Sequence, residues 1–258
     1  MSKEVLGGIR KLNWVLQESG GGGFSFSELC AIMSELTDAN TYILNARGKI
    51  LAVHYVIEAD SAAISDPETG ADFFPLEYNE ELMKVDKTIY NMTPQEVMKI
   101  FKYEYETLDK YYMVVPIIGG GQRWGTVVLL RYEPAFDEVD IALGEYGATV
   151  VGLEIQNRKA LENEEEERKR ATVQMALGTL SYSEMGAVTK IFEELGGTEG
   201  ILVASKIADH EKITRSVIVN ALRKLESAGV IESRSLGMKG THIKVTNSKF
   251  YEELNKIS

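Results

Sequence analysis

The sequence predicts an α+β protein with two domains of ordinary size. Its 258 residues, of which 44% are hydrophobic and 26% charged, are enough for two hydrophobic cores. The first half contains two pairs of apolar, β-rich runs, and a turn sequence joins each pair. An unbroken helical pattern then leads into a C-terminal part where helices precede two short strands.

The first forty residues predict two helices. Val5 to Gln17 have apolar side chains at helical spacing, and we expect the stretch Ser19 to Gly23 to end that helix. A second helix is predicted to start after Ser27, as its N-cap, and to run through Leu36. Its apolar stripe consists of Leu29, Ile32, Met33 and Leu36.

Two predicted hairpins follow. "TYILNARGKILAVHY" places two β-rich runs around a turn at residues 45–48. Residues 58–72 show no periodicity and contain Pro67 and Gly70, which predicts a mobile loop. "YYMVVPII" and "WGTVVLLRY", joined by "GGGQR", then predict a central hairpin.

A long helix is predicted from Phe136 and Asp137 onward. Because no proline or glycine occurs from Leu153 to Leu177, we expect this helix to be continuous and to act as a connector. Its acidic run Glu164 to Glu167 predicts a solvated face. A further helix is predicted with Ser183 as its N-cap and a stop at Gly196 and Gly197.

Charge is distributed unevenly along the chain. The net charge is -11, yet residues 201–250 alone carry +5, so this end can approach a polyanion that the rest repels. The single cysteine, Cys30, excludes an intrachain disulfide and favours the cytoplasm. The three histidines lack metal-ligand spacing, and the N-terminus resembles neither a signal peptide nor a membrane span. We therefore expect no metal, no cofactor and no membrane partner.

The C-terminal part predicts a winged helix-turn-helix. From Leu202 onward the order is helix, turn, helix, strand, glycine-bearing turn and strand. The second helix has Thr214 as N-cap and ends at Gly229, and the wing consists of "VIESRS", "LGMKG" and "THIKV". Its predicted buried stripe consists of Ile218, Leu222 and Leu225.

The opposite face of that helix carries hydroxyl, amide and cationic groups that can reach bases and phosphates, while cations of the wing can hold the DNA backbone. The candidate DNA-binding residues are Ser205, Thr214, Arg215, Ser216, Asn220, Arg223, Lys224, Arg234, Lys239 and Lys244. The pattern resembles GntR-type winged helices, in which "SR" at the helix start and "KGT" in the wing contact DNA. Here these positions are Thr214-Arg215 and Lys239-Gly240-Thr241.

Over nearly its full length the sequence resembles the CodY family, most specifically in "VVPIIGGG", "LGEYGATVVGLEI" and the stretch from Leu202 to Val245. The resemblance implies a GAF domain at residues 1–136, a long linker helix at 137–178, a winged helix-turn-helix at 179–258, and a homodimer. It also implies a regulator, mainly a repressor, whose affinity for double-stranded operator DNA is raised by branched-chain amino acids (isoleucine, leucine or valine) and by GTP.

The resemblance further implies an amino-acid site. It would be lined by Phe74, Pro75, Tyr78 and Phe101. Aromatic and proline walls suit a branched aliphatic chain because they desolvate it without leaving polar groups unpaired. Relatives pair the ligand carboxylate with an arginine in the preceding loop, but here that loop is "EADSAAISDPETG". The carboxylate therefore needs backbone N–H groups or a cation from elsewhere.

A GTP site is implied between the GAF domain, the linker helix and the winged helix. Its candidate residues are Asn45, Arg47, Lys49, Glu154 and Lys159. Arg47 and Lys49 suit phosphates, and Glu154 can accept hydrogen bonds from a guanine edge. Ala46 stands where relatives carry another arginine.

Two alternatives compete with this interpretation. A nucleotide-hydrolysing enzyme would need a P-loop, but "GGGQRWGT" lacks the terminal G-K-[ST] and lies between two strands. Cys30 and the histidines have no supporting catalytic motif either, so we expect no enzyme. The other alternative is a GAF-type signalling or interaction module without direct DNA contact, which the salt dependence of duplex binding would distinguish.

Overall fold

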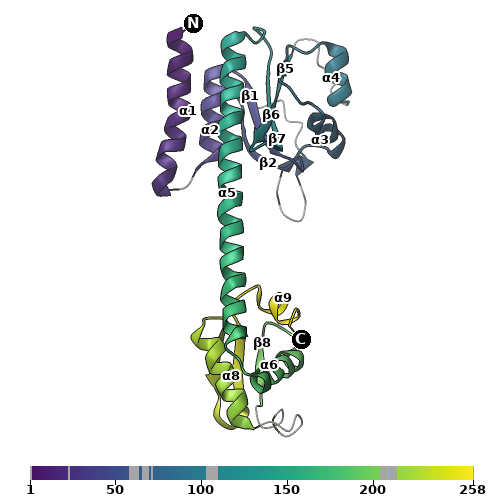
Figure 1. The fold of residues 1–258 in the computed structure, drawn as a ribbon. Helices are drawn as coiled ribbons and strands as arrows, with labels where there is room; N and C mark the ends of the chain where they lie inside the picture. Colours follow the sequence, from purple (N-terminus) through teal and green to yellow (C-terminus); the bar gives the residue numbers. More distant parts are fainter. Residues whose placement is uncertain are drawn as a thin grey trace. The chain divides into compact units, whose positions relative to one another are not determined.

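The computed structural model describes residues 2–22, 24–57, 64–65, 70, 72–102, 110–203, 208 and 214–257. The chain divides into two compact units, residues 1–159 and residues 160–258. The division falls inside one continuous helix, α5 (Glu138–Gly178), labelled in Figure 1. The long helix predicted from the absence of helix-breaking residues is therefore confirmed.

Unit 1 contains a five-stranded antiparallel sheet. Its strands are β1 (Asn40–Asn45), β2 (Ile50–His54), β5 (Ile89–Tyr90), β6 (Tyr111–Gly119) and β7 (Gln122–Arg131). They follow the order β2-β1-β7-β6-β5. Both predicted hairpins, β1–β2 and β6–β7, are confirmed by their strand pairing.

The turn between β6 and β7 is shorter than the predicted "GGGQR". Only Gly120 and Gly121 lie outside the strands, and both have a positive φ, +58° and +75°. This is the backbone conformation that a two-residue hairpin turn requires and that glycine adopts without strain. The flanking Gly119 and Gln122 are paired with each other.

Helices cover both faces of this sheet (Figure 1). On one face lie α1 (Ser2–Gly22), α2 (Phe26–Thr37) and the first part of α5, and on the other lie α3 (Leu76–Met83) and α4 (Pro94–Ile100). Because side chains alternate along a strand, β7 contributes to two separate cores. Val127 and Leu129 pack in the core beneath α1, α2 and α5, whereas Val128 and Leu130 pack beneath α3 and α4.

Two predicted helix starts are wrong by two residues. The N-cap of α2 is Ser25, not Ser27, and the N-cap of α6 (Tyr182–Leu195) is Ser181, not Ser183. The reason is in the sequence, because each true cap has a glutamate three residues later, in the S-x-x-E spacing of a capping box. At the start of α6 both bonds of the box form, between Ser181 and Glu184.

Three other expectations need correction. Helix α1 continues through Gly22 instead of ending at Ser19, since glycine lowers helix stability without removing a backbone donor. Within the predicted loop 58–72, β3 (Ile64–Ser65) pairs with β4 (Asp72–Phe73), while residues 58–63, 66–69 and 71 lie outside the described residues. Helices α3 and α4 and strand β5 were not predicted, because such short elements show no clear periodicity.

Unit 2 surrounds a second core. It contains the end of α5, α6, β8 (Glu199–Leu202), α8 (Arg215–Ser227), β9 (Ile231–Ser235), β10 (Thr241–Val245) and α9 (Phe250–Leu254). The sheet order is β8-β10-β9, so the predicted wing strands β9 and β10 are confirmed, while β8 and α9 were missed. Of the helix predicted within residues 202–213, only residues 202, 203 and 208 are described.

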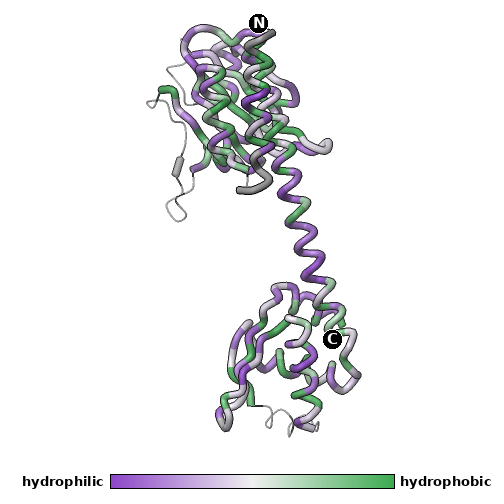
Figure 2. Tube along the Cα trace, turned by 90° about the vertical axis from the view of Figure 1, so that its left-hand side faces the viewer, coloured by the Kyte–Doolittle hydropathy of each residue, from purple (hydrophilic) through white to green (hydrophobic). Residues whose placement is uncertain are grey.

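The middle of α5 is polar. Residues 156–168 are all exposed, and Figure 2 shows most of this stretch in the hydrophilic colour. The predicted solvated face at Glu164 to Glu167 is therefore confirmed. The last turns of α5 become apolar again, where Val173 and Leu177 are fully buried in the core of unit 2.

Candidate DNA-binding surface and ligand sites

Helix α8 has the amphipathic pattern that the sequence predicted. Ile218 and Leu225 are fully buried and Leu222 is 5% exposed, which fixes this side of the helix against the core. Thr214 is the N-cap, but its side chain caps no backbone N–H group. Its hydroxyl oxygen instead lies 2.8 Å from the Ser216 hydroxyl oxygen, so two predicted DNA-binding residues are already in contact.

The opposite side of α8 faces solvent. Arg215, Ser216, Asn220 and Arg223 are exposed. Within the part of the chain that the structure describes, the side chains of Arg215, Asn220 and Arg223 have no hydrogen-bond or ion-pair partner. Their donors are therefore available to an incoming phosphate or base edge.

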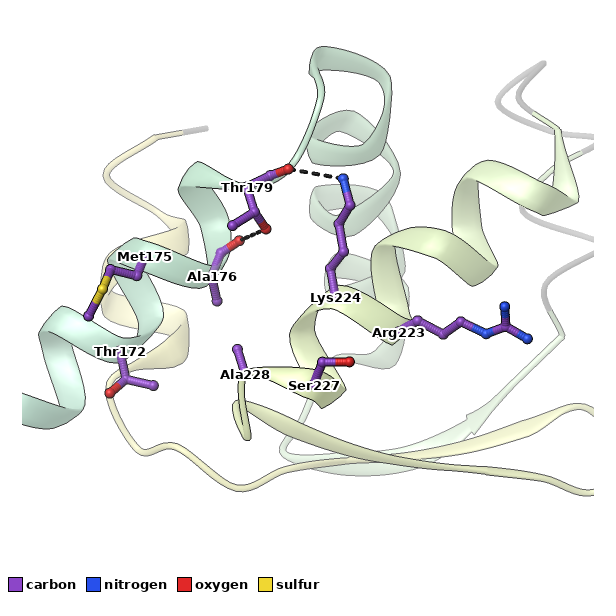
Figure 3. A pocket seen from close by; sticks show the side chains of 8 residues that line it. All are labelled: Thr172, Met175, Ala176, Thr179, Arg223, Lys224, Ser227 and Ala228. Carbon is purple, nitrogen blue, oxygen red and sulfur yellow. Dashed lines mark hydrogen bonds between the residues drawn. The ribbon is translucent and has the colours of Figure 1, made fainter.

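Lys224 differs from its neighbours on α8. Its ammonium group donates to the Glu184 carboxylate at 2.7 Å and to the Thr179 carbonyl at 3.0 Å. Figure 3 shows Lys224 reaching toward Thr179 while Arg223 extends away from it. The Lys224 bond and the Ser181 backbone N–H together lower the pKa of Glu184 below its ordinary value. Lys224 therefore joins α8 to the start of α6.

The wing presents further cations. Arg234, Lys239 and Lys244 are all exposed, and over residues 214–257 none has a side-chain ion-pair partner. Gly240 in the wing turn has φ +109°, and a Cβ atom there would lie 2.5 Å from the Leu202 carbonyl oxygen, so only glycine fits. Of the ten predicted DNA-binding residues, Ser205 lies outside the described residues.

A groove of about 550 Å³ lies in unit 2 between the last turns of α5 and the end of α8 (Figure 3). Its walls consist of Thr172, Met175, Ala176, Thr179, Arg223, Lys224, Ser227 and Ala228. Met175 is 69% exposed although it is apolar. Arg223 is thus shared between this groove and the polar face of α8.

The predicted amino-acid-binding residues lie together in unit 1. Phe74, Tyr78 and Phe101 are at most 4% exposed, and Phe101 makes edge contacts with both other rings at centroid distances of 6.5 and 5.5 Å. Tyr112 stacks on Phe101 at 5.0 Å. Half-buried Pro75 is the N-cap of α3 and accepts the backbone N–H groups of that helix's first turn. As it stands, the cluster is filled by its own rings.

A half-buried cation that the sequence reasoning missed, Arg123, contacts α3. The Nη2 atom of Arg123, on β7, donates to the Leu82 carbonyl at 3.2 Å and to the Thr126 hydroxyl at 2.9 Å. Its Nε and Nη1 atoms are buried and have no hydrogen-bond partner. Burial lowers the pKa of Arg123 to about 10. On α3, the Oδ1 atom of Asn79 is likewise buried without a partner.

The predicted GTP-binding residues of the first hairpin form a compact turn. The Asn45 side chain accepts the backbone N–H groups of Arg47 at 2.9 Å and of Lys49 at 3.1 Å. Asn79 on α3 also donates to the Ala46 carbonyl at 3.1 Å. The Arg47 and Lys49 side chains are exposed, and the described residues give them no ion-pair partner. The turn therefore presents two free cations on a fixed backbone.

The two α5 residues predicted for GTP binding are both engaged. Glu154, 9% exposed, accepts from Arg158 at 2.7 Å, and Lys159 lies 5.3 Å from the centre of the Trp124 ring. Asn45 is paired with Gly125, the residue next to Trp124, so the first hairpin and Lys159 lie at the same end of the sheet. The structure thus brings the hairpin and α5 residues to one region of unit 1.

Two further structural findings limit the kinds of site. The described residues contain no group of three or more His, Cys, Asp or Glu side chains placed to hold a metal ion. Among the described helices, none is both long and apolar enough to cross a membrane.

Comparison with known proteins gives the same family for both units. A family model described as the CodY GAF-like domain matches residues 4–179, and one described as the CodY helix-turn-helix domain matches residues 198–258. The global transcriptional regulator CodY of Caldanaerobacter subterraneus subsp. tengcongensis is 52% identical over 248 residues, 96% of each chain. That of Anoxybacillus flavithermus is 51% identical over 254 residues, again 96% of each chain.

A solved structure is similar to the first part of the chain. It is the cofactor-binding GAF domain of the nutrient sensor CodY from Clostridium difficile, with 42% sequence identity and a TM-score of 0.50. The match covers 60% of this chain and 99% of that one. Two family models and relatives that are about half identical over nearly the full length lead to one conclusion. This chain belongs to the CodY family, whose members are global transcriptional regulators and not enzymes.

Proposed function

We propose that this protein binds double-stranded operator DNA, mainly as a repressor, and that a branched-chain amino acid and GTP raise its affinity for DNA. The observation that carries the proposal is the polar face of α8, where Arg215, Asn220 and Arg223 are exposed and have no side-chain partner among the described residues. Such a face, beside a basic wing, has the donors that a major groove and its phosphates require.

The uneven charge along the chain indicates which part binds DNA and which part binds effectors. Residues 201–250 carry a net charge of +5 within a chain of -11, so we assign DNA binding to residues 179–258 and effector binding to residues 1–136. We further propose that residues 137–178, nearly all in α5, transmit effector binding, and that the protein acts in the cytoplasm as a homodimer. Two copies would engage two half-sites of one operator.

The two effectors are assigned to different parts of unit 1. The cluster of Phe74, Tyr78 and Phe101, with Pro75 beside it, would take the aliphatic side chain of isoleucine, leucine or valine. The side chains of Arg47 and Lys49 would take the phosphates of GTP, with Asn45, Glu154 and Lys159 as the other contacts. Each effector must bind the DNA-competent state more tightly, typically by ~1–3 kcal/mol.

Titration of duplex DNA tests the proposal. A duplex selected by the wild-type chain from a randomised pool is compared with a scrambled duplex of equal length, by fluorescence anisotropy at several salt concentrations. We expect log affinity to fall linearly with log salt, by about 0.9 per phosphate contact. A flat salt dependence, or no selected sequence, would favour an interaction module that contacts no DNA.

Changing the residues at the start of α8 tests which face reads the sequence. We expect the double change Arg215→Ala and Ser216→Ala to remove ~1–3 kcal/mol of preference for the selected duplex, because a base contact is lost. The matched control is Lys239→Ala in the wing, which should weaken binding to both duplexes equally. An unchanged preference in the double variant would reject α8 as the recognition helix.

A further inference from the structure

Two orphaned polar groups lie under the same helix of unit 1. Arg123 has two buried N–H-bearing atoms, Nε and Nη1, without an acceptor, and Asn79 has a buried carbonyl oxygen without a donor. Arg123 reaches α3 through the Leu82 carbonyl, and Asn79 belongs to α3 one helical turn earlier. One orphaned group therefore contacts this short helix and the other belongs to it.

Arg123 as a whole is half-buried, but two of its guanidinium nitrogen atoms are buried without an acceptor, which is unfavourable. Each buried donor left without an acceptor costs about 1–3 kcal/mol. Burial alone accounts for the lowered pKa of Arg123, and no carboxylate among the described residues forms an ion pair with it. Because native structures keep few such groups, each one calls for an explanation such as a ligand or an ordered water.

The residues around Arg123 indicate which chemical groups an anionic ligand at this position would carry. Leu82, whose carbonyl it contacts, belongs to the same core cluster as Phe74, Tyr78 and Phe101. Thr126, its other partner, precedes Val128 of that cluster by two residues on the same face of β7. A ligand held here would combine a carboxylate with an apolar side chain. The Asn79 oxygen, an acceptor, adds a place for an ammonium group.

We propose that Arg123 pairs with the carboxylate of the amino-acid effector and that the Asn79 side-chain oxygen accepts a hydrogen bond from its α-ammonium group. The inference deepens the proposed function and rests on it, because the effector is the branched-chain amino acid assigned to the neighbouring aromatic cluster. It supplies the cation that the loop of residues 58–70 lacks.

Comparison of isoleucine with isoleucinamide tests the pairing, because the amide keeps the side chain and the ammonium group but has no negative charge. Affinities are measured by isothermal titration calorimetry on the full chain. We expect the wild type to prefer isoleucine by about 10- to 100-fold, the range for a hydrogen-bonded charge pair. Arg123→Met should bind both compounds equally weakly. Arg123→Lys, which keeps the charge with fewer donors, should restore part of the preference.

The ratio of the affinities for isoleucine and isoleucinamide is informative, because a variant that merely disturbs the fold weakens the binding of both compounds equally. The matched control is Arg10→Met on the exposed side of α1, which should keep the wild-type preference. If Arg123→Met still prefers the acid as strongly as the wild type does, a water fills the site and this inference is wrong, while the proposed effector stands. If the wild type binds neither compound, the amino-acid effector fails and this inference fails with it.

Asn79 is tested separately with the keto acid that corresponds to isoleucine, which has no ammonium group. The wild type should prefer isoleucine over the keto acid, and Asn79→Leu should lose that preference while keeping its preference for the acid over the amide. Thermal unfolding of each variant checks that it is folded. An Asn79→Leu chain that still discriminates against the keto acid would remove Asn79 from the site.

Discussion

The Lys224 ammonium group lies 2.7 Å from the Glu184 carboxylate, and this contact divides the cations at the end of α8 into two kinds. Lys224 fixes α8 to the start of α6, whereas the adjacent Arg223 is exposed and has no partner among the described residues. Both were predicted to bind DNA from the sequence, because both are cationic and nothing near them in the sequence shows that Lys224 is engaged elsewhere. Their different surroundings lead to different expected effects on DNA affinity and on stability.

Replacing each cation by methionine should separate these effects. Arg223→Met should weaken DNA binding and reduce the salt slope by about one, because one phosphate contact is lost. Lys224→Met should lower the free energy of unfolding by about 1 kcal/mol, with little change in the salt slope. Anisotropy titrations across salt and denaturant unfolding measure the two quantities. Equal losses of slope in both variants would contradict the distinction.

Glu184 should make stability depend on pH. Its pKa in the folded chain is depressed by Lys224 and by the Ser181 backbone N–H. Because the pKa is lower in the folded chain, the carboxylate stabilises the fold when the pH is above the pKa of the unfolded chain, about 4.3. This contribution disappears as the pH falls through the pKa of the folded chain. The stability difference between wild type and Glu184→Gln should therefore shrink below about pH 4.

Denaturant unfolding from neutral to acidic pH measures that difference. The control is Glu194→Gln, because this residue lies on the same helix but is exposed. Its stability should follow the wild type at every pH. A gap between wild type and Glu184→Gln that stays constant into strongly acidic solution would show that the Glu184 charge is not the cause.

Cys30 should be unreactive in the folded chain. Burial raises the pKa of its thiol to about 12, and the thiol donates to the Thr41 carbonyl at 3.1 Å. Since the thiolate is the nucleophile, a disulfide reagent at about pH 8 should label Cys30 only when unit 1 opens. Isoleucine and GTP should slow labelling if they bind the folded state. Immediate labelling without denaturant would contradict the buried position.

A control for this experiment uses the same helix. Ser27 is exposed on α2, so Ser27→Cys in a Cys30→Ala chain should react within the mixing time. The comparison separates burial from any general slowness of the reagent.

The two cations of the first hairpin should bind the phosphates of GTP through their charge. The Arg47 and Lys49 side chains are exposed, so replacing both by alanine should leave the melting temperature unchanged while weakening GTP about tenfold or more. Calorimetry with GTP and with guanosine measures the effect. The variant should lose affinity for GTP only, because guanosine has no phosphates. Equal losses for both ligands would place the phosphates elsewhere.

The elements that could be predicted are those with a long repeating pattern. Strands β6 and β7 and the buried side of α8 each present an uninterrupted pattern of apolar residues. Helix α5, whose middle is polar, was predictable because no proline or glycine interrupts it from Leu153 to Leu177. The true helix starts at Ser25 and Ser181 were also readable, since each serine is followed by glutamate in S-x-x-E spacing. Helix α3 spans only eight residues, which is too few for a helical pattern to stand out.

The sequence identifies which residues carry suitable charges for the sites, but not which residues they contact in the folded chain. A hairpin with Arg47 and Lys49 can be identified from its turn and its charges. The Lys224 bond depends on Glu184, forty residues away, and nothing near Lys224 in the sequence indicates it. Arg123 is a lone charge at the start of an apolar strand, which was a usable signal. That two of its nitrogen atoms have no acceptor depends on how α3 crosses β7.

The most direct test of the account is DNA affinity measured at one fixed salt concentration with isoleucine, GTP, both or neither. The full wild-type chain is titrated with its selected duplex in each condition. We predict that each effector tightens binding, and that the two together do so by at least ~1 kcal/mol, the lower end of an ordinary coupling energy. Identical affinities in all four conditions would contradict the claim that this protein is an effector-controlled regulator.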